Sequence, residues 1–268
     1  ILISLFSLTV ISCAKKSDSS SSSTTNTTTS DNTTTTSSGL YIAVGASGTL
    51  LTSSDGTTWT SRTSGTSNDL RGVTYGNGLF VIVGYSGTIL TSSDGSTWTS
   101  RTSGTTVGFT GFDYGNSIFM VVGLTGTIQA STGGTTWTAK TSGTTKDLYN
   151  VSFINNPFIA TGNGTIISSS DGITWSAMTS NSGNLWGIDY GNSTLVTVGD
   201  SGKIITSTDN GTSWTTRTSG TSNSRYQVVY GNNTFLAVGA TGTVLTSTDN
   251  GTSWTSRTSG TTNILYGM

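Results

Sequence analysis

A unit of about 39 residues repeats from residue 39 to residue 268, and every copy carries a tryptophan at the same place. The repeated tryptophans are Trp59, Trp98, Trp137, Trp175, Trp214 and Trp254. A period near 40 with several short strands per unit is typical of a β-propeller, in which each unit is a blade that cannot bury its faces without its neighbours. The sequence therefore predicts an all-β propeller of six four-stranded blades over residues 39–268.

The second unit shows how one blade is built. Residues 70–75 alternate as a first strand, and the pair Asn77-Gly78 favours a tight hairpin. Residues 79–83 form a continuous apolar run, which indicates a strand covered on both faces by neighbouring blades. Residues 88–92 and 97–102 then supply the third strand and an outer, Thr-rich fourth strand.

The composition excludes most catalytic chemistry. The chain has no histidine and no glutamate, and it has one cysteine, so neither a Ser-His-Asp nor a Cys-His site can be assembled. Its glycine pairs precede strands instead of helices, so they are hairpins and not phosphate loops. A net charge of −1 gives no reason to expect nucleic acid as a partner. We expect no enzyme activity, no cofactor and no metal.

The N-terminal segment combines an apolar run, a cysteine and a polar tract. The apolar run, residues 1–12, is too short to span a bilayer as a helix, and Cys13 follows it directly. Residues 17–38 are almost wholly Ser, Thr, Asn and Asp, which predicts a disordered tether. The alternatives are a non-lipidated secretory signal and a buried cysteine in an ordinary apolar segment.

The run that ends in Val10-Ile11-Ser12-Cys13 resembles the lipobox of bacterial lipoprotein signal peptides. The resemblance implies a signal peptide over residues 1–13, lipid attachment at Cys13, a tether over residues 14–38 and the propeller over residues 39–268. It further implies a membrane-anchored lipoprotein of the bacterial cell envelope, with the outer membrane or the cell surface favoured over the inner membrane. The only membrane contact expected is through this lipid.

A turn of the form Ser-x-Asp-(x)-Gly-x-Thr/Ser-Trp recurs in the blades. It resembles the Asp-box of sialidase-like propellers, also known as the BNR repeat, and the whole blade resembles the photosystem II stability/assembly-factor-like repeats. The resemblance is specific for the fold. The aspartates of the pattern are Asp55, Asp94, Asp171, Asp209 and Asp249, and Gly133 replaces the aspartate in the third unit. One carboxylate per turn supplies too few ligands for calcium, so we interpret these aspartates as structural.

The two ends of the repeat region are complementary. Residues 263–268 align with the first strand of a blade, and residues 39–45 align with a second strand. We therefore expect the C-terminal strand to complete the first blade and close the ring, which removes exposed sheet edges. The assembly-factor-like family is usually seven-bladed, so a chain that continues past Met268 would have seven blades.

Positions that vary among similar repeats point to recognition. One position early in the first strand reads Arg71, Thr110, Tyr149, Trp186, Tyr226 and Tyr266, and the loop between second and third strands contributes Tyr85 and Asp200. Aromatic rings beside an arginine and an aspartate suit binding of sugar faces or a peptide. The alternative is that these rings only line the central channel. The candidate ligand-binding residues are Arg71, Tyr85, Tyr149, Trp186, Asp200, Tyr226 and Tyr266.

Three classes of function remain. The first is a monomeric, lipid-anchored propeller that binds a glycan, a cell-wall polymer or a protein of the envelope, and the second is an assembly or chaperone-like scaffold for envelope proteins. A tethered coat protein without a specific ligand is the third. A degenerate sialidase-like glycosidase is disfavoured, because the resemblance implies a tyrosine activated by a glutamate and this chain has no glutamate. An inverting glycosidase needs two carboxylates across a cleft, and Asp113 and Asp189 are the only candidate pair.

Overall fold

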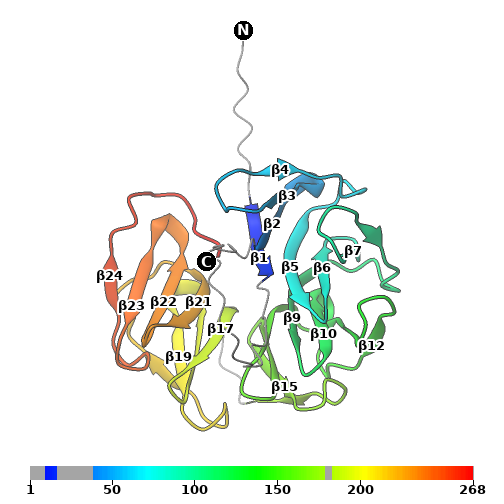
Figure 1. The fold of residues 1–268 in the computed structure, drawn as a ribbon. Helices are drawn as coiled ribbons and strands as arrows, with labels where there is room; N and C mark the ends of the chain where they lie inside the picture. The colour runs from blue at the N-terminus through cyan, green and yellow to red at the C-terminus, as the bar shows by residue number, and fades with distance from the viewer. Residues whose placement is uncertain (1–9, 17–38, 179–182, 268) are drawn as a thin grey trace, which may run out of the picture.

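The computed structural model describes residues 10–16, 39–178 and 183–267. These residues form six antiparallel sheets of four strands each, and in every sheet the strands pair in chain order. Figure 1 shows the six sheets around a central axis, with the first strands nearest to it, and consecutive first strands contact each other from β1 to β21. The predicted all-β propeller with six four-stranded blades is confirmed. Within the described ranges, no helix is long and apolar enough to cross a membrane.

The strands of the first three blades are β1 (Val10–Lys16), β2 (Leu40–Gly45), β3 (Leu50–Ser53), β4 (Thr60–Ser61), β5 (Leu70–Gly76), β6 (Leu79–Gly84), β7 (Ile89–Ser92), β8 (Thr99–Ser100), β9 (Phe109–Gly115), β10 (Ile118–Gly123), β11 (Ile128–Ser131) and β12 (Thr138–Lys140). Those of the last three are β13 (Leu148–Phe153), β14 (Phe158–Gly162), β15 (Thr165–Ser169), β16 (Ser176–Ala177), β17 (Leu185–Gly191), β18 (Thr194–Gly199), β19 (Ile204–Ser207), β20 (Thr215–Arg217), β21 (Arg225–Gly231), β22 (Thr234–Gly239), β23 (Val244–Ser247) and β24 (Thr255–Arg257). Short 3-10 turns join second to third strands at η1 (Ala46–Gly48), η2 (Leu124–Gly126), η3 (Asp200–Gly202) and η4 (Ala240–Gly242).

The hydrophobic core lies between the blades. Each apolar cluster combines residues of two consecutive sheets, as where Val81 and Ile89 of blade 2 pack with Phe119 of blade 3. Trp137 of blade 3 completes that cluster and is only 8% exposed. The second strands of blades 2 to 5 are buried on both faces, which is why they read as continuous apolar runs.

Blades 1 and 6 do not share such a core among the described residues. Trp59 of blade 1 is 37% exposed, because it has no preceding blade to enter. On blade 6, Val244 and Thr246 are half-buried, whereas the equivalent Ile89 and Thr91 of blade 2 are buried. The described residues therefore form five interblade cores, none of them between blades 6 and 1.

The first strand of blade 1 is β1, not the C-terminal segment, so the prediction that residues 263–268 supply it is wrong in this structure. The pairs Val10↔Gly45 and Ser12↔Val44 reproduce the register and the bulge seen at Leu70↔Gly84 and Gly72↔Val83 in blade 2. Because β1 pairs with the backbone N–H and C=O groups at the edge of β2, no place is left there for another strand.

The C-terminal segment is held by blade 6 instead. Its described residues, 263–267, form no strand. The Leu265 N–H donates to the Gly239 carbonyl at 3.0 Å, and the Gly242 N–H donates to the Asn263 carbonyl at 2.8 Å. The segment thus follows the path by which the chain enters each new blade.

The sheet of blade 1 includes residues upstream of the predicted boundary at residue 39. The predicted signal peptide, residues 1–13, and tether, residues 14–38, lie mostly outside the described residues. Cys13 is described as part of β1, where it pairs with Ala43. The signal-peptide and tether assignments stay predictions.

Arg225 is a charged residue inside an apolar interface. It begins β21 at the position that Leu70, Leu148 and Leu185 occupy in their blades, and it is 0% exposed. None of its three guanidinium nitrogens has a hydrogen-bond partner, and burial lowers the pKa of the side chain to about 10. Burying an unpaired charge opposes folding.

Replacing this arginine by the leucine of the equivalent positions should stabilise the protein. We expect Arg225→Leu to raise the unfolding free energy by about 1 kcal/mol or more and Tm by about 2–4 °C, because it removes the cost of burying the charge. Thermal unfolding followed by circular dichroism measures the shift. The control is Arg257→Leu, which removes an exposed charge of the outer strand β24 and should leave Tm nearly unchanged. A lower Tm for Arg225→Leu would contradict the described environment.

Candidate functional site

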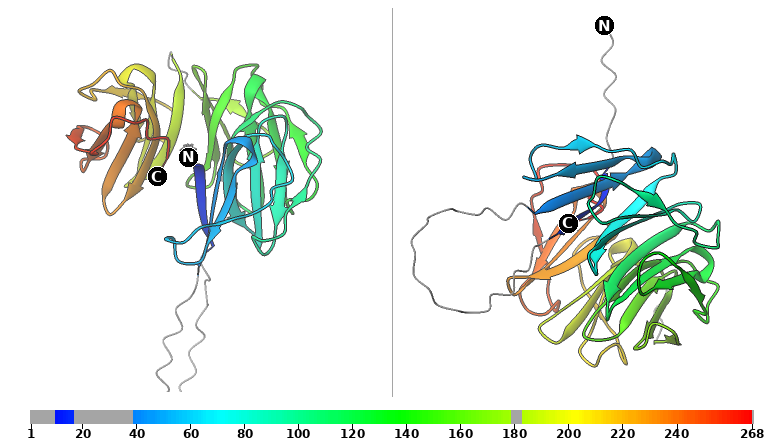
Figure 2. Two further views of the ribbon diagram at one scale, coloured as in Figure 1. Left: turned by 90° about the horizontal axis from the view of Figure 1, so that it is seen from above. Right: turned by 45° about the vertical axis from the view of Figure 1, so that its right-hand side comes forward.

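The loops that enter the first strands and the turns between second and third strands form one face of the molecule, here called the channel-mouth face. Hydrogen bonds join them between neighbouring blades: the Ser47 N–H donates to Asp69 Oδ1 and the Thr125 N–H donates to Asp147 Oδ1, each at 2.8 Å. Figure 2 shows the blades from the side, with connecting loops at the two opposite ends of the strands. The candidate residues predicted from the repeats all lie in or next to these loops.

Four aromatic side chains on this face form a continuous series, here called the aromatic ladder. The rings of Tyr149 and Trp186 stack at 4.1 Å between centroids with an interplanar angle of 17°. Tyr226 meets Trp186 edge-on at 5.9 Å, and Tyr266 lies 5.3 Å beyond Tyr226. The ladder therefore runs from blade 4 across blades 5 and 6 to the C-terminal segment, where Tyr266 is 48% exposed.

Two pairs of neighbouring first strands approach closely at a glycine, and one of these pairs carries Trp186 and Tyr226 of the ladder. A Cβ at Gly187 would lie 3.0 Å from Gln227 Cα and 3.0 Å from the Tyr226 carbonyl oxygen. Gly187 follows Trp186 directly, so the missing side chain lets the strand that carries Tyr226 come alongside. Gly111 plays the same part between β9 and β13, where a Cβ would lie 2.6 Å from Asn150 Cα.

Asp200 is fixed beside the ladder by two neutral donors. Trp186 Nε1 donates to Asp200 Oδ1 and Asn184 Nδ2 donates to Asp200 Oδ2, both at 2.7 Å. The indole orientation is thus held by a charge-assisted hydrogen bond as well as by stacking. Asn184 was missed by the sequence analysis, although it stands one residue before the buried leucine of the first strand, where other blades have Asp69 and Asp147.

Two ladder tyrosines lie within the fields of nearby carboxylates. Burial raises the pKa of Tyr149, and the charges of Asp147 and Asp200 raise it further. Burial also raises the pKa of Tyr226, with smaller contributions from Tyr266 and Asp200. Both phenols therefore keep their protons at neutral pH and can donate hydrogen bonds to a ligand.

Arg71 and Tyr85 form a separate group in blade 2. The Arg71 guanidinium carbon lies 5.0 Å from the centroid of the Tyr85 ring, a cation–π arrangement. In blade 3 the equivalent of Arg71 is Thr110, whose hydroxyl donates to the Leu148 carbonyl. The structure thus brings five of the seven candidate residues together, namely the aromatic ladder and Asp200, and places the other two in this pair.

Asp113 and Asp189 join neighbouring blades inside the channel. Each accepts a hydrogen bond from its own strand and one from the next blade: Phe153 N–H donates to Asp113 Oδ2 at 2.7 Å, and Tyr230 N–H donates to Asp189 Oδ2 at 2.6 Å. Burial raises the pKa of both carboxyls, and the charge of Asp189 contributes to the shift at Asp113. Their oxygens are engaged by backbone donors, which gives the pair a structural task.

Comparisons with known proteins support the fold. A family model described as the DUF6242 beta propeller domain matches residues 112–224. A structure of YCF48 bound to a D1 peptide is similar at 20% identity and a TM-score of 0.67, covering 81% of this chain and 76% of that one. YCF48 from Cyanidioschyzon merolae is similar at 16% identity and a TM-score of 0.69, covering 96% of this chain and 87% of the other.

A third similar structure is a catalytically inactive histidine-to-alanine variant of virginiamycin B lyase from Staphylococcus aureus with quinupristin. It shares 12% identity at a TM-score of 0.71 and covers 83% of this chain and 81% of its own. No curated protein matches the chain by sequence. At these identities the likeness establishes a repeat β-propeller and nothing finer.

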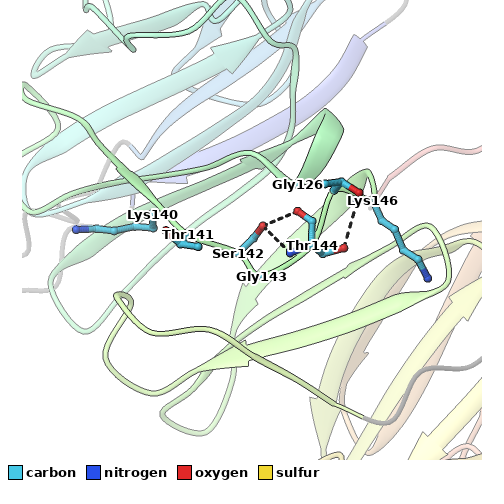
Figure 3. Close-up of a pocket in the computed structure, with 8 residues that line it drawn as sticks. Gly126, Lys140, Thr141, Ser142, Gly143, Thr144 and Lys146 are labelled. Atoms are coloured by element: carbon cyan, nitrogen blue, oxygen red, sulfur yellow. Dashed lines mark hydrogen bonds between the residues drawn. The ribbon is translucent and has the colours of Figure 1, made fainter.

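A shallow depression of about 570 Å³ on blade 3 is lined by Gly126 and residues 140–146 (Figure 3). Its hydroxyls are used within the turn, since Ser142 Oγ donates to the Thr144 carbonyl and the Lys146 N–H donates to Thr144 Oγ1. In Figure 3, Lys140 and Lys146 point away from the turn in opposite directions. An equivalent depression recurs on blade 6, so we interpret both as products of a repeated turn. Within the described ranges, no group of three or more potential metal-ligating side chains comes together.

The aspartate turns lie on the opposite face, where Asn192 Nδ2 donates to Asn250 Oδ1 of the next blade. In the turn of blade 2, Asp94 Oδ1 accepts the N–H groups of Ser96 and Thr97 at 2.7 and 2.9 Å. Trp98 Nε1 closes the turn by donating to the Gly95 carbonyl. In blade 3 the same bond from Trp137 to Gly134 persists without an aspartate. This geometry supports the structural interpretation of these residues.

These turns should make stability fall in acid. Hydrogen bonds from backbone and serine groups hold the pKa values of Asp94, Asp171, Asp209 and Asp249 at about 2, below the ordinary 3.8. A carboxylate whose pKa is lower in the folded state stabilises the fold at pH values above its unfolded-state pKa. This stabilisation is lost as the pH falls from about 4 to 2. The buried Asp113 and Asp189 act with the opposite sign, because their pKa values are raised.

We therefore expect Tm to decrease between pH 4 and pH 2, and to decrease less in Asp94→Gly, which copies the natural turn of blade 3. Calorimetry at several pH values measures both slopes. Equal slopes for the two proteins would show that the hydrogen bonds of Asp94 do not contribute to folding.

Proposed function

We propose that this chain is a non-enzymatic scaffold that binds an extended segment of a partner protein across the aromatic ladder. The observation that carries the proposal is the series of ring contacts that joins Tyr149, Trp186, Tyr226 and Tyr266 into one surface on the channel-mouth face. Aromatic rings offer large contact areas with little conformational freedom to lose, which makes them frequent anchors of protein interfaces.

The comparison with YCF48 favours a peptide over a glycan. That protein was determined with a D1 peptide bound, so a propeller of this shape is compatible with peptide recognition. In the present chain the ladder, Asp200 and the phenol hydroxyls provide stacking surfaces and hydrogen-bonding groups for a peptide backbone. A glycan or cell-wall polymer would use the same chemistry and is the competing outcome of the test.

The absence of catalysis is part of the proposal. The chain has no histidine, whereas the inactive lyase variant was made by replacing a histidine. The carboxylates Asp113 and Asp189 hold backbone N–H groups of adjacent blades and are not left free for acid–base work.

Binding to arrayed peptides, glycans and peptidoglycan fragments tests this function. We expect selected peptides to bind the full chain, and the variant Trp186→Ala/Tyr226→Ala/Tyr266→Ala to lose at least tenfold in affinity because the stacking surface is gone. Trp59→Ala is the matched control, since it removes an exposed tryptophan away from the ladder. Peptide binding that survives in the triple variant, or binding of glycans alone, would contradict the proposal.

We further propose that the protein is anchored in the bacterial cell envelope by a lipid on Cys13. The support is the apolar run before this residue and the polar tract after it. Lipidation with cleavage at Cys13 would remove Val10–Ser12 from β1, so the processed chain must fill the edge of β2 differently.

Mass spectrometry of the protein from bacterial membranes checks the anchor. We expect an N-terminal peptide that begins at a diacylated Cys13, and we expect Cys13→Ser to abolish the modification and release the protein from the membrane fraction. An unmodified Cys13 in membrane-derived protein would exclude lipid anchoring at this residue.

A further inference from the structure

The aromatic ladder lies next to two carboxylates, Asp147 and Asp200. Asp200 contacts the ladder directly through Trp186 Nε1. Asp147 precedes the strand that carries Tyr149, and its charge reaches the Tyr149 phenol together with that of Asp200. The ladder is therefore flanked by negative charge at blades 4 and 5.

Neither carboxylate has a cationic partner within the described residues. Asp200 accepts hydrogen bonds from the neutral Trp186 and Asn184, and Asp147 accepts one from a backbone N–H. The neighbouring Lys146 directs its ammonium to the Gly164 carbonyl at 3.0 Å. Carboxylates engaged only by neutral donors keep their full charge available to a ligand.

The faces of aromatic rings attract cations, and a desolvated ring beside a carboxylate attracts them more strongly. Tyr266 leaves ring surface open at the end of the ladder, beyond Tyr226. We infer that the ladder and Asp200 together bind a cationic side chain, a lysine ammonium or an arginine guanidinium, of the partner segment. This inference rests on the proposed function and adds the charge of the ligand to it.

An acidic ligand does not fit this end of the face. Carboxylates of the ligand would meet Asp147 and Asp200 without a compensating arginine, since Arg71 is stacked on Tyr85 in blade 2. Like charges in a partly buried site repel by several times more than in water. The charge arrangement thus selects basic over acidic segments.

Three peptides with identical ends separate charge from stacking. They are acetylated and amidated Gly-Lys-Gly-Lys-Gly, its norleucine analogue and its glutamate analogue, titrated into the full chain and followed by isotope-labelled NMR. We expect the lysine peptide to bind roughly tenfold more tightly than the norleucine peptide, and the glutamate peptide to bind most weakly.

Two substitutions locate the effect. Asp200→Asn should abolish the preference for lysine over norleucine without unfolding the chain, because the Asn184 amide can turn to present its oxygen to the new amide. Asp69→Asn is the control, since Asp69 lies on the same face but is bonded to Ser47 in another blade. The preference for lysine should survive in that variant.

Equal affinity for the three peptides, a preference for glutamate, or no binding by any of them would overturn the inference. A lysine preference unchanged in Asp200→Asn would also overturn it. If peptides bind regardless of charge and the triple ladder variant loses them all, the proposed function stands and the charge selectivity fails. If substitution of the ladder residues leaves binding to the arrays unchanged, the proposed function itself is rejected.

Discussion

The packing of the repeated tryptophans of blades 2 to 6 into the apolar cores that these blades share with the preceding blade is the interaction on which the rest of this structure depends. Trp137 packs with Val81 and Phe119, and its equivalents in blades 2, 4, 5 and 6 pack in the same way. A single four-stranded sheet of this length cannot bury enough apolar surface to fold alone. The turn that places the tryptophan, with its aspartate and glycine, therefore contributes to stability through the neighbouring blade.

This interblade packing also builds the candidate site. Once the blades pack, their first strands must approach closely near the axis, and glycines such as Gly187 permit backbone contact there. The residues at the position of Trp186 in the first strands then face their counterparts in the next blade. Where those residues are aromatic, in blades 4 to 6, they stack into the ladder; where they are Arg71 and Thr110, they do not. The candidate recognition surface is thus a consequence of repeat geometry combined with residues that the geometry leaves free to vary.

Much of this arrangement follows from the sequence, because a repeated pattern states the same prediction several times. The blade number, the buried second strands and the meeting of Tyr149, Trp186, Tyr226 and Tyr266 were all predictable. The identity of the first strand of blade 1 was not, since residues 263–268 carry the pattern of that strand and Val10–Lys16 does not, and only the strand pairing shows that β1 occupies the place. The fourth strand of blade 2 was predicted over residues 97–102 but spans Thr99–Ser100, because the outermost strand has a partner on one side only. Asn184 and the burial of Arg225 depend on contacts between loops and blades that no local pattern encodes.

The central claim is that the aromatic ladder is the surface at which a basic segment of a partner binds. Intermolecular nuclear Overhauser effects between a labelled lysine peptide and the protein test this claim most directly. The account predicts contacts from the lysine ε-methylene protons to the rings of Trp186, Tyr226 and Tyr266. Contacts confined to Arg71 and Tyr85, or to the outer strands of the blades, would contradict it.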